Sequence, residues 1–193
     1  MTLLEATTLA RVKAHLKITD TTDDTRLGEL IQGVSDEIEK YLDSKLMQES
    51  QTEELDVRQN QRVWYLRSRI NAVTSVKTRT DWDWASASAL DSDLYHFVDQ
   101  EHQLYISSGP LIGRRTLQVV YTGGFATSTA NLVANFPAIA TAADYQVVQE
   151  WRRKENLAAV SRSSRGGNKS WGDEHQMLER VRQMLDPYRR LVT

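Results

Sequence analysis

The sequence contains no cysteine. A chain without thiols forms no disulfide, thiolate zinc site, iron–sulfur cluster or cysteine nucleophile. It also has no run of the roughly 18 apolar residues that a membrane span needs, and it begins with no basic and apolar signal-peptide segment. With 40% hydrophobic and 26% charged residues among 193, the composition is typical of one soluble domain or two small ones. A disordered polymer, a collagen-like chain and a coiled-coil rod are excluded.

Charge is unevenly distributed along the chain. The formal net charge is only −2, which argues against a dedicated nucleic-acid binder. Acidic residues nevertheless dominate residues 1–60, the two signs nearly balance over 61–150, and basic residues dominate 151–193. Such asymmetry indicates a binding surface, which could serve head-to-tail assembly, a basic channel lining or a solvated tail.

Apolar residues near the N-terminus recur with helical spacing. Leu9, Val12 and Leu16 form one stripe and predict a first helix. After a polar, Asp-rich break at residues 19–24, a second and longer apolar stripe predicts a helix of about five turns, with Asp side chains to cap it. Its members are Leu27, Leu30, Ile31, Val34, Ile38, Tyr41 and Leu42.

The middle of the chain changes to short runs of β-branched, aromatic and leucine residues. They predict five or six strands around residues 55–57, 63–66, 73–76, 94–98, 104–106 and 117–121. Strands so closely spaced leave no room for crossover helices, so we expect a mainly antiparallel sheet.

The last third returns to helical spacing. Pro137 suits the first turn of a helix that reaches Ala159. A flexible basic linker rich in Ser, Arg and Gly should follow, and then an amphipathic helix that stops at Pro187. The predicted fold is therefore α+β: a helical bundle of two N-terminal and two C-terminal helices with an inserted, mainly antiparallel β domain. We expect the N-terminal helices in residues 1–50 and the inserted β-sheet region in 51–125. The long helix should lie in 126–160, and the basic linker with the last helix in 161–193.

Side chains with catalytic or metal-binding potential are present, but they do not form a recognised site. His96 and His102, with Asp99 and Glu101 between them, are more typical of ordinary strand and loop residues than of a metal centre. The run from Asp81 to Trp84 begins like a calcium loop but lacks its later ligands. No nucleophile elbow or P-loop pattern occurs. We expect no enzyme activity, no metal and no cofactor.

Two other features indicate partner contacts. Trp82 and Trp84 stand in one polar loop, where they either rest on the sheet or meet a partner. Basic residues gather around the end of the long helix and the linker, among them Arg162, Arg165 and Lys169. These residues could be a solvated helix end, a phosphate-facing surface or a docking segment.

The N-terminal segment resembles that of tailed-phage head–tail connector, or adaptor, proteins. The resemblance lies in the run from Leu9 to Ile18, the Asp-rich gap, and the helix that ends Ile38-Glu39-Lys40-Tyr41-Leu42. It continues from Val119 to Phe125 and from Phe136-Pro137 to Trp151-Arg152-Arg153. It covers residues 7–45 and 117–156 well, and the strand region only in general layout.

The resemblance implies a structural protein of the virion neck, at the head–tail interface, made in the cytoplasm of a bacterial host. The family forms a ring, expected to be a dodecamer, that joins the portal protein to a stopper or tail-completion protein. Packaged DNA passes through the ring without sequence-specific binding, and no membrane is involved.

The resemblance also implies that the C-terminal segment reaches into the portal. The candidate docking residues are Arg162, Arg165, Lys169, Trp171, Met177, Leu178, Val181 and Leu185. The other reading of the last helix is that it packs on its own bundle. The alternative function is a small monomeric nucleic-acid-binding domain that uses the basic C-terminal region.

Overall fold

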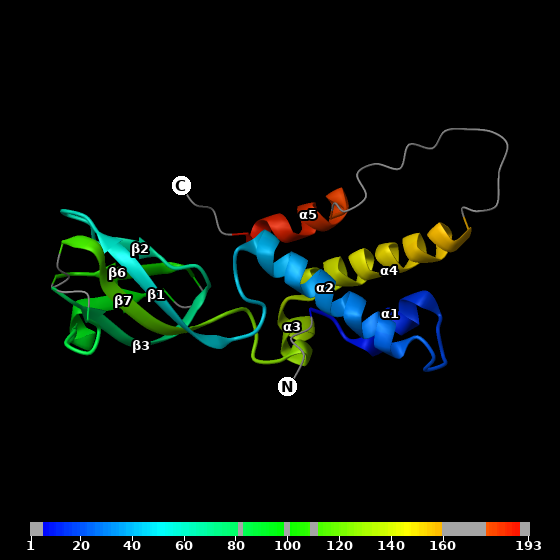
Figure 1. Cartoon of the computed structure of the whole chain (residues 1–193), viewed down its shortest axis with the longest axis horizontal. Coiled ribbons are helices and arrows are strands. Elements are labelled where there is room, and N and C mark those ends of the chain that lie inside the picture. Colours follow the sequence, from blue (N-terminus) through cyan, green and yellow to red (C-terminus); the bar gives the residue numbers. More distant parts are fainter. Residues whose placement is uncertain (1–5, 81–82, 99–100, 109–111, 160–176, 190–193) are drawn as a thin grey trace. The chain divides into compact units, whose positions relative to one another are not determined.

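The computed structural model describes residues 6–80, 83–98, 101–108, 112–159 and 177–189, with no side-chain detail for 154–159. The chain forms two compact units. The helical unit combines Met1–Leu42 with Ser128–Arg189, and the β unit comprises Asp43–Thr127 together with Arg190–Thr193. Figure 1 shows helices in the first unit and strands in the second. The α+β class predicted from the sequence is confirmed.

The helical unit contains five α-helices among the residues described. They are α1 (Leu9–Leu16), α2 (Asp24–Leu42), α3 (Thr129–Asn135), α4 (Pro137–Ala159) and α5 (Glu179–Leu185), which a 3₁₀ turn at Asp186–Tyr188 extends. The hydroxyl of Thr8 caps α1 by accepting a hydrogen bond from the Arg11 backbone N–H. The hydroxyl of Ser128 caps α3 in the same way. Pro137 begins α4, as its fixed φ predicts.

The core of the helical unit is built from the predicted stripes. Leu27, Ile31, Val34, Ile38 and Leu42 of α2 are buried. On α4 the buried stripe consists of Ile139, Ala143, Val147 and Trp151. The neighbouring Ala140 and Ala142 are buried as well, so the alanine-rich part of α4 packs inside its own unit.

The β unit contains seven strands among the residues described. They are β1 (Glu49–Val57), β2 (Val63–Tyr65), β3 (Ile70–Thr78), β4 (Ser88–Ala89), β5 (Tyr95–Phe97), β6 (Gln103–Ile106) and β7 (Gly113–Gly123). They form a four-stranded sheet in the order β1-β7-β3-β4 and a three-stranded sheet in the order β2-β6-β5. Every pairing between these strands is antiparallel, as predicted.

Both sheets contribute to one hydrophobic core. Trp64, Leu104 and Ile106 come from the small sheet, and Val76, Leu117, Val119 and Tyr121 from the large one. On β7 burial alternates along the strand from Leu117 to Gly123. One face of β7 therefore lies on the core, and the other carries Gln118, Val120 and Thr122.

The segments that enter and leave the β unit lie against each other. Met47 forms a parallel bridge with Ala126, and the Gln48 N–H donates to the Ala126 carbonyl at 2.8 Å. Gly124 has φ +139°, and a side chain there would collide with the Met47 backbone. A glycine is required because only it combines this φ with so close an approach.

None of the helices in the described ranges is both long and apolar enough to cross a membrane.

Candidate assembly surfaces

Helix α5 and the two residues before it carry the apolar side chains that the sequence predicted as a docking face. Met177, Val181 and Leu185 are buried in the helical unit, and Leu178 is half-buried. While α5 occupies this position, the first three side chains are not available to another protein. The basic candidates Arg162, Arg165 and Lys169, together with Trp171, lie outside the described residues.

Polar contacts fix α5 beside α4. The Leu178 N–H, at the start of the helix, donates to Oε1 of the buried Gln146 at 3.1 Å. The guanidinium of Arg180 lies over the Tyr145 ring, 4.7 Å from its centroid. These contacts set the orientation of α5 and add to the burial of its apolar face.

A second attachment links the end of α5 to α2. The Tyr41 hydroxyl donates to Oδ1 of Asp186 at 2.6 Å, and the Arg189 guanidinium lies 5.2 Å from the Tyr41 ring centroid. The hydrogen bond to Asp186 raises the pKa of Tyr41, because the bond exists only while the phenol keeps its proton.

A buried carboxylate in α4 holds the N-terminal part of the helical unit. Asp144 is 2% exposed, and its oxygens accept hydrogen bonds from the Thr7 hydroxyl at 2.5 Å and from Arg11 Nε and Nη2 at 3.2 and 2.6 Å. His15 Nε2 lies 3.5 Å from the same carboxylate. The cluster ties α1 and the residues before it to α4, because a carboxylate this buried needs such partners.

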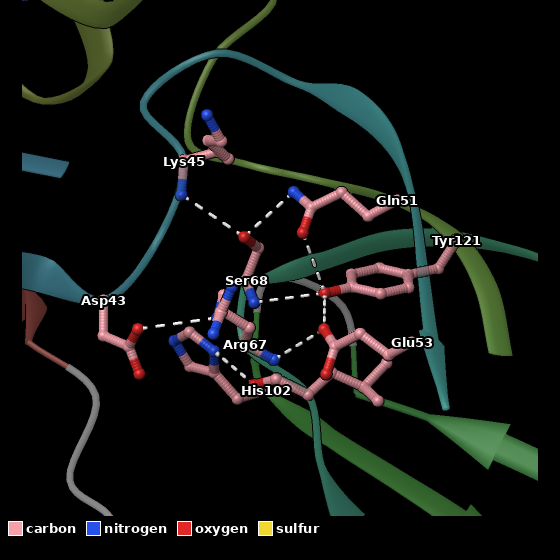
Figure 2. A network of polar contacts seen from close by, with 9 residues as sticks. Asp43, Lys45, Gln51, Glu53, Arg67, Ser68, His102 and Tyr121 are labelled. Carbon is pink, nitrogen blue, oxygen red and sulfur yellow. Dashed lines mark hydrogen bonds and ion pairs between the residues drawn. The ribbon is translucent and has the colours of Figure 1, made fainter. Parts of the chain in front are cut away.

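The β unit has its own buried polar network, which Figure 2 shows around Tyr121. The Tyr121 hydroxyl donates to Glu53, lies 3.1 Å from Oε1 of Gln51, and accepts from the Ser68 N–H at 3.2 Å. The Arg67 N–H donates to the same Glu53 carboxylate at 2.8 Å. Burial, reinforced by the hydrogen bond to Glu53, raises the pKa of the Tyr121 phenol far above its usual value. The network pins the loop between β2 and β3 onto β1 and β7, which is a structural role.

Trp84, one of the two predicted loop tryptophans, rests on the large sheet. Its Nε1 donates to Oε1 of Glu54 at 2.7 Å, and the buried Arg79 guanidinium lies 3.8 Å from its ring centroid. Arg115 Nε forms an ion pair with the same carboxylate at 3.2 Å. Trp82 lies outside the described residues. Trp84 therefore has an intramolecular role that does not require a partner.

The outer face of the small sheet exposes aromatic side chains. Tyr65 and Tyr105 are 44% and 40% exposed, and the β2–β6 register places them on the same face, with His96 opposite Tyr105. A shallow pocket beside this face is lined by Arg62, which directly precedes β2, by Leu94 in the turn before β5, and by residues of β5 and β6. This surface was not predicted from the sequence, although the alternation Val63-Trp64-Tyr65 was the available signal.

The histidines considered as metal ligands, His96 and His102, lie in different surroundings. His96 lies on the exposed sheet face, and Nδ1 of His102 lies 3.2 Å from the Leu66 carbonyl oxygen. Within the part of the chain that the structure describes, no three His, Asp or Glu side chains are grouped so that they could hold a metal ion.

Chains from gene transfer agent particles share this architecture. A family model for head completion proteins matches residues 5–191. No curated protein matches the sequence. A chain in the neck of an empty gene transfer agent (GTA) particle, computed with C6 symmetry, superposes with a TM-score of 0.65 at 14% identity, covering 97% of this chain and 91% of that one.

Two further solved chains share the fold. One is from the virion of a native GTA particle, with a TM-score of 0.61 and 16% identity. The other is from the neck of a native GTA particle computed with C12 symmetry, with a TM-score of 0.60 and 15% identity. Each comparison covers 100% of this chain and 97% of the other.

The fold and the sequence match together define a structural protein of a phage-like particle rather than an enzyme. The chain belongs to the head completion protein family.

Proposed function

We propose that this protein forms a ring in the neck of a phage-like particle, where it joins the portal to a stopper or tail-completion protein and continues the DNA exit channel. The observation that carries the proposal is the family match over residues 5–191. Nearly full-length likeness to chains from GTA necks supports the same position in the particle.

The ring is proposed to be a dodecamer of identical chains. The C12 symmetry stated for one neck with a chain of the same fold supports this number. A cyclic ring needs a heterologous interface, in which two different surfaces of each chain meet. The exposed tyrosine face of the small sheet, with Tyr65 and Tyr105, offers one apolar surface suited to such a contact.

The portal contact is proposed to use the basic stretch before α5, including Arg162, Arg165, Lys169 and Trp171. Charged and aromatic side chains there suit an acidic, partly apolar portal surface. Met177, Leu178, Val181 and Leu185 serve this contact indirectly, by holding α5 on the helical unit. Contact of Trp82 with a partner protein stays a prediction from the sequence.

For DNA to pass, the wall of the channel must not bind the duplex tightly. The near-neutral balance of the chain suits this role, since tight phosphate binding needs a concentrated positive surface. Sequence-specific DNA contacts are not part of the proposal.

The test is a mass measurement of the purified chain alone and mixed with portal rings. Rings of this chain on the portal, stable to nuclease, are the expected result. A chain that stays monomeric and ignores the portal would overturn the proposal. A monomer that instead binds duplex DNA, with affinity falling steeply as salt rises, would favour the nucleic-acid-binding alternative.

A further inference from the structure

Helix α5 is held in place by the α4 surface on which it packs, here called the α4 seat, rather than by its own helical stability. It has only seven residues, and an isolated helix of that length is unstable in water. Its position is set by the buried face formed by Met177, Val181 and Leu185 and by contacts with Gln146 and Tyr145 on α4. Because the end of α5 is also bonded to Tyr41 on α2, any copy that presents the same α4 surface together with Tyr41 can hold α5 equally well.

The connection between α4 and α5 is longer than this seat requires. Leu178 is bonded to Gln146, and α4 ends at Ala159. A path from Ala159 back to Gln146 runs about 20 Å along the helix axis. Residues 160–176 can span about 55 Å when extended. The connector therefore has more than twice the length that seating α5 on its own α4 demands.

We propose that, in the assembled ring, α5 of one copy occupies the α4 seat of the adjacent copy. This inference rests on the ring proposed above. Exchange of an identical element keeps every contact of the seat, so it costs no contact energy. It converts a bond within one chain into a bond between subunits, and the high local concentration of the neighbouring seat in a ring favours that conversion. The surplus connector length is what permits it.

The absence of cysteine makes the proposal testable by cross-linking. Two single variants, Tyr145→Cys and Arg180→Cys, each carry one thiol at the contact between α4 and α5. The two variants are mixed, assembled on portal rings and treated with a short bismaleimide. Exchange predicts a covalent dimer in the mixture and its loss when either variant is assembled alone.

A matched control uses Gln183→Cys in place of Arg180→Cys. Gln183 is exposed on the same helix, as Arg180 is, but its side chain donates to Glu179 instead of lying over the Tyr145 ring, so mere crowding in the ring would link the two cysteine pairs equally. Equal dimer yields from the two pairs would overturn the exchange.

A variant with a shorter segment between α4 and α5 tests the exchange without changing the residues through which α5 packs. Deletion of residues 162–169 leaves about 30 Å of reach, which covers the path of about 20 Å to the chain's own seat but leaves only about 10 Å for reaching a neighbour. We expect loss of the dimer from the mixture, while the double variant Tyr145→Cys/Arg180→Cys still forms its link within one chain. If rings form but all links lie within single chains, the exchange is wrong and the ring stands. If the mass measurement finds no ring with or without the portal, both proposals fail.

Discussion

Arg11 on α1 donates two hydrogen bonds to the Asp144 carboxylate on α4, from Nε at 3.2 Å and from Nη2 at 2.6 Å. The two residues are 133 positions apart in the sequence. The Asp144 side chain is 3% exposed, whereas the Arg11 side chain is 35% exposed. The pair thus joins a buried acceptor to a donor that still reaches water, and Thr7 supplies a third hydrogen bond from within the unit.

Replacement of Asp144 by Ala should destabilise the helical unit. The change removes a buried charge-assisted network and leaves the Thr7 hydroxyl without its acceptor, which we expect to cost about 3 kcal/mol in the free energy of unfolding. Asp36→Ala is the matched control, because Asp36 is exposed on α2 and should cost no more than about 0.5 kcal/mol. Denaturant titration measures both, and equal losses would contradict the role of Asp144.

Removal of the Tyr121 hydroxyl should change how stability depends on alkaline pH. Because folding raises the pKa of this phenol, the folded chain holds the proton more tightly than the unfolded chain. That contribution is complete below a pH of about 10, the ordinary tyrosine pKa, and is lost as the pH rises above it. The unfolding free energy of Tyr121→Phe should therefore fall less steeply above pH 10 than that of the parent chain.

The control for this measurement is Tyr105→Phe. The Tyr105 hydroxyl donates to Gln103 on the exposed sheet face, and its removal should leave both the stability and the alkaline slope within error of the parent chain. At neutral pH, Tyr121→Phe should also cost about 1–3 kcal/mol, since the Ser68 N–H loses its acceptor. A slope unchanged from the parent would refute the burial argument.

Two glycine-to-alanine variants should have opposite effects. Gly124→Ala places a side chain against the Met47 backbone at φ +139°, and we expect a loss of at least about 2 kcal/mol. Gly33→Ala lies in the exposed part of α2, where an added Cβ meets nothing within 4 Å, and should gain up to about 1 kcal/mol. Thermal unfolding of the two variants provides the comparison, and a neutral Gly124→Ala would show that the crossing segments can separate.

Trp84 should stabilise the β unit in the absence of any partner. Trp84→Ala removes the cation–π contact with Arg79 and the hydrogen bond to Glu54, together worth about 2 kcal/mol. Trp84→Phe keeps an aromatic ring beneath Arg79 and should lose about half as much. If the purified Trp84→Ala chain is as stable as the parent, the indole is held for a partner instead.

The long helices were predictable from sequence because their cores are periodic. The α2 stripe from Leu27 to Leu42 is buried as expected, although the helix begins earlier, at Asp24. α3 was not predicted, because its seven residues bury only Leu132 and present no repeating stripe. β1 was predicted only from Leu55, whereas the strand begins at Glu49. Its polar first half is held by pairing with β7, which no local pattern reveals.

The polar clusters depend on contacts between distant parts of the chain. Asp144 meets Thr7 and Arg11 over more than 130 positions, and Tyr121 meets Glu53 over 68. The amphipathic spacing of the C-terminal apolar residues predicted that they bind a partner. That spacing serves packing and docking equally, and only the fold places Val181 and Leu185 in the interior.

The parallel bridge between Met47 and Ala126 has a consequence for the history of the chain. The β unit begins and ends at adjacent points, as an inserted domain does. Such a domain can be gained or lost without separating the parts of the helical unit. A chain spliced directly from Leu42 to Ser128 would retain each of the five α-helices found among the described residues. Gain or loss of the β unit would then take a single insertion or excision at this point of the chain.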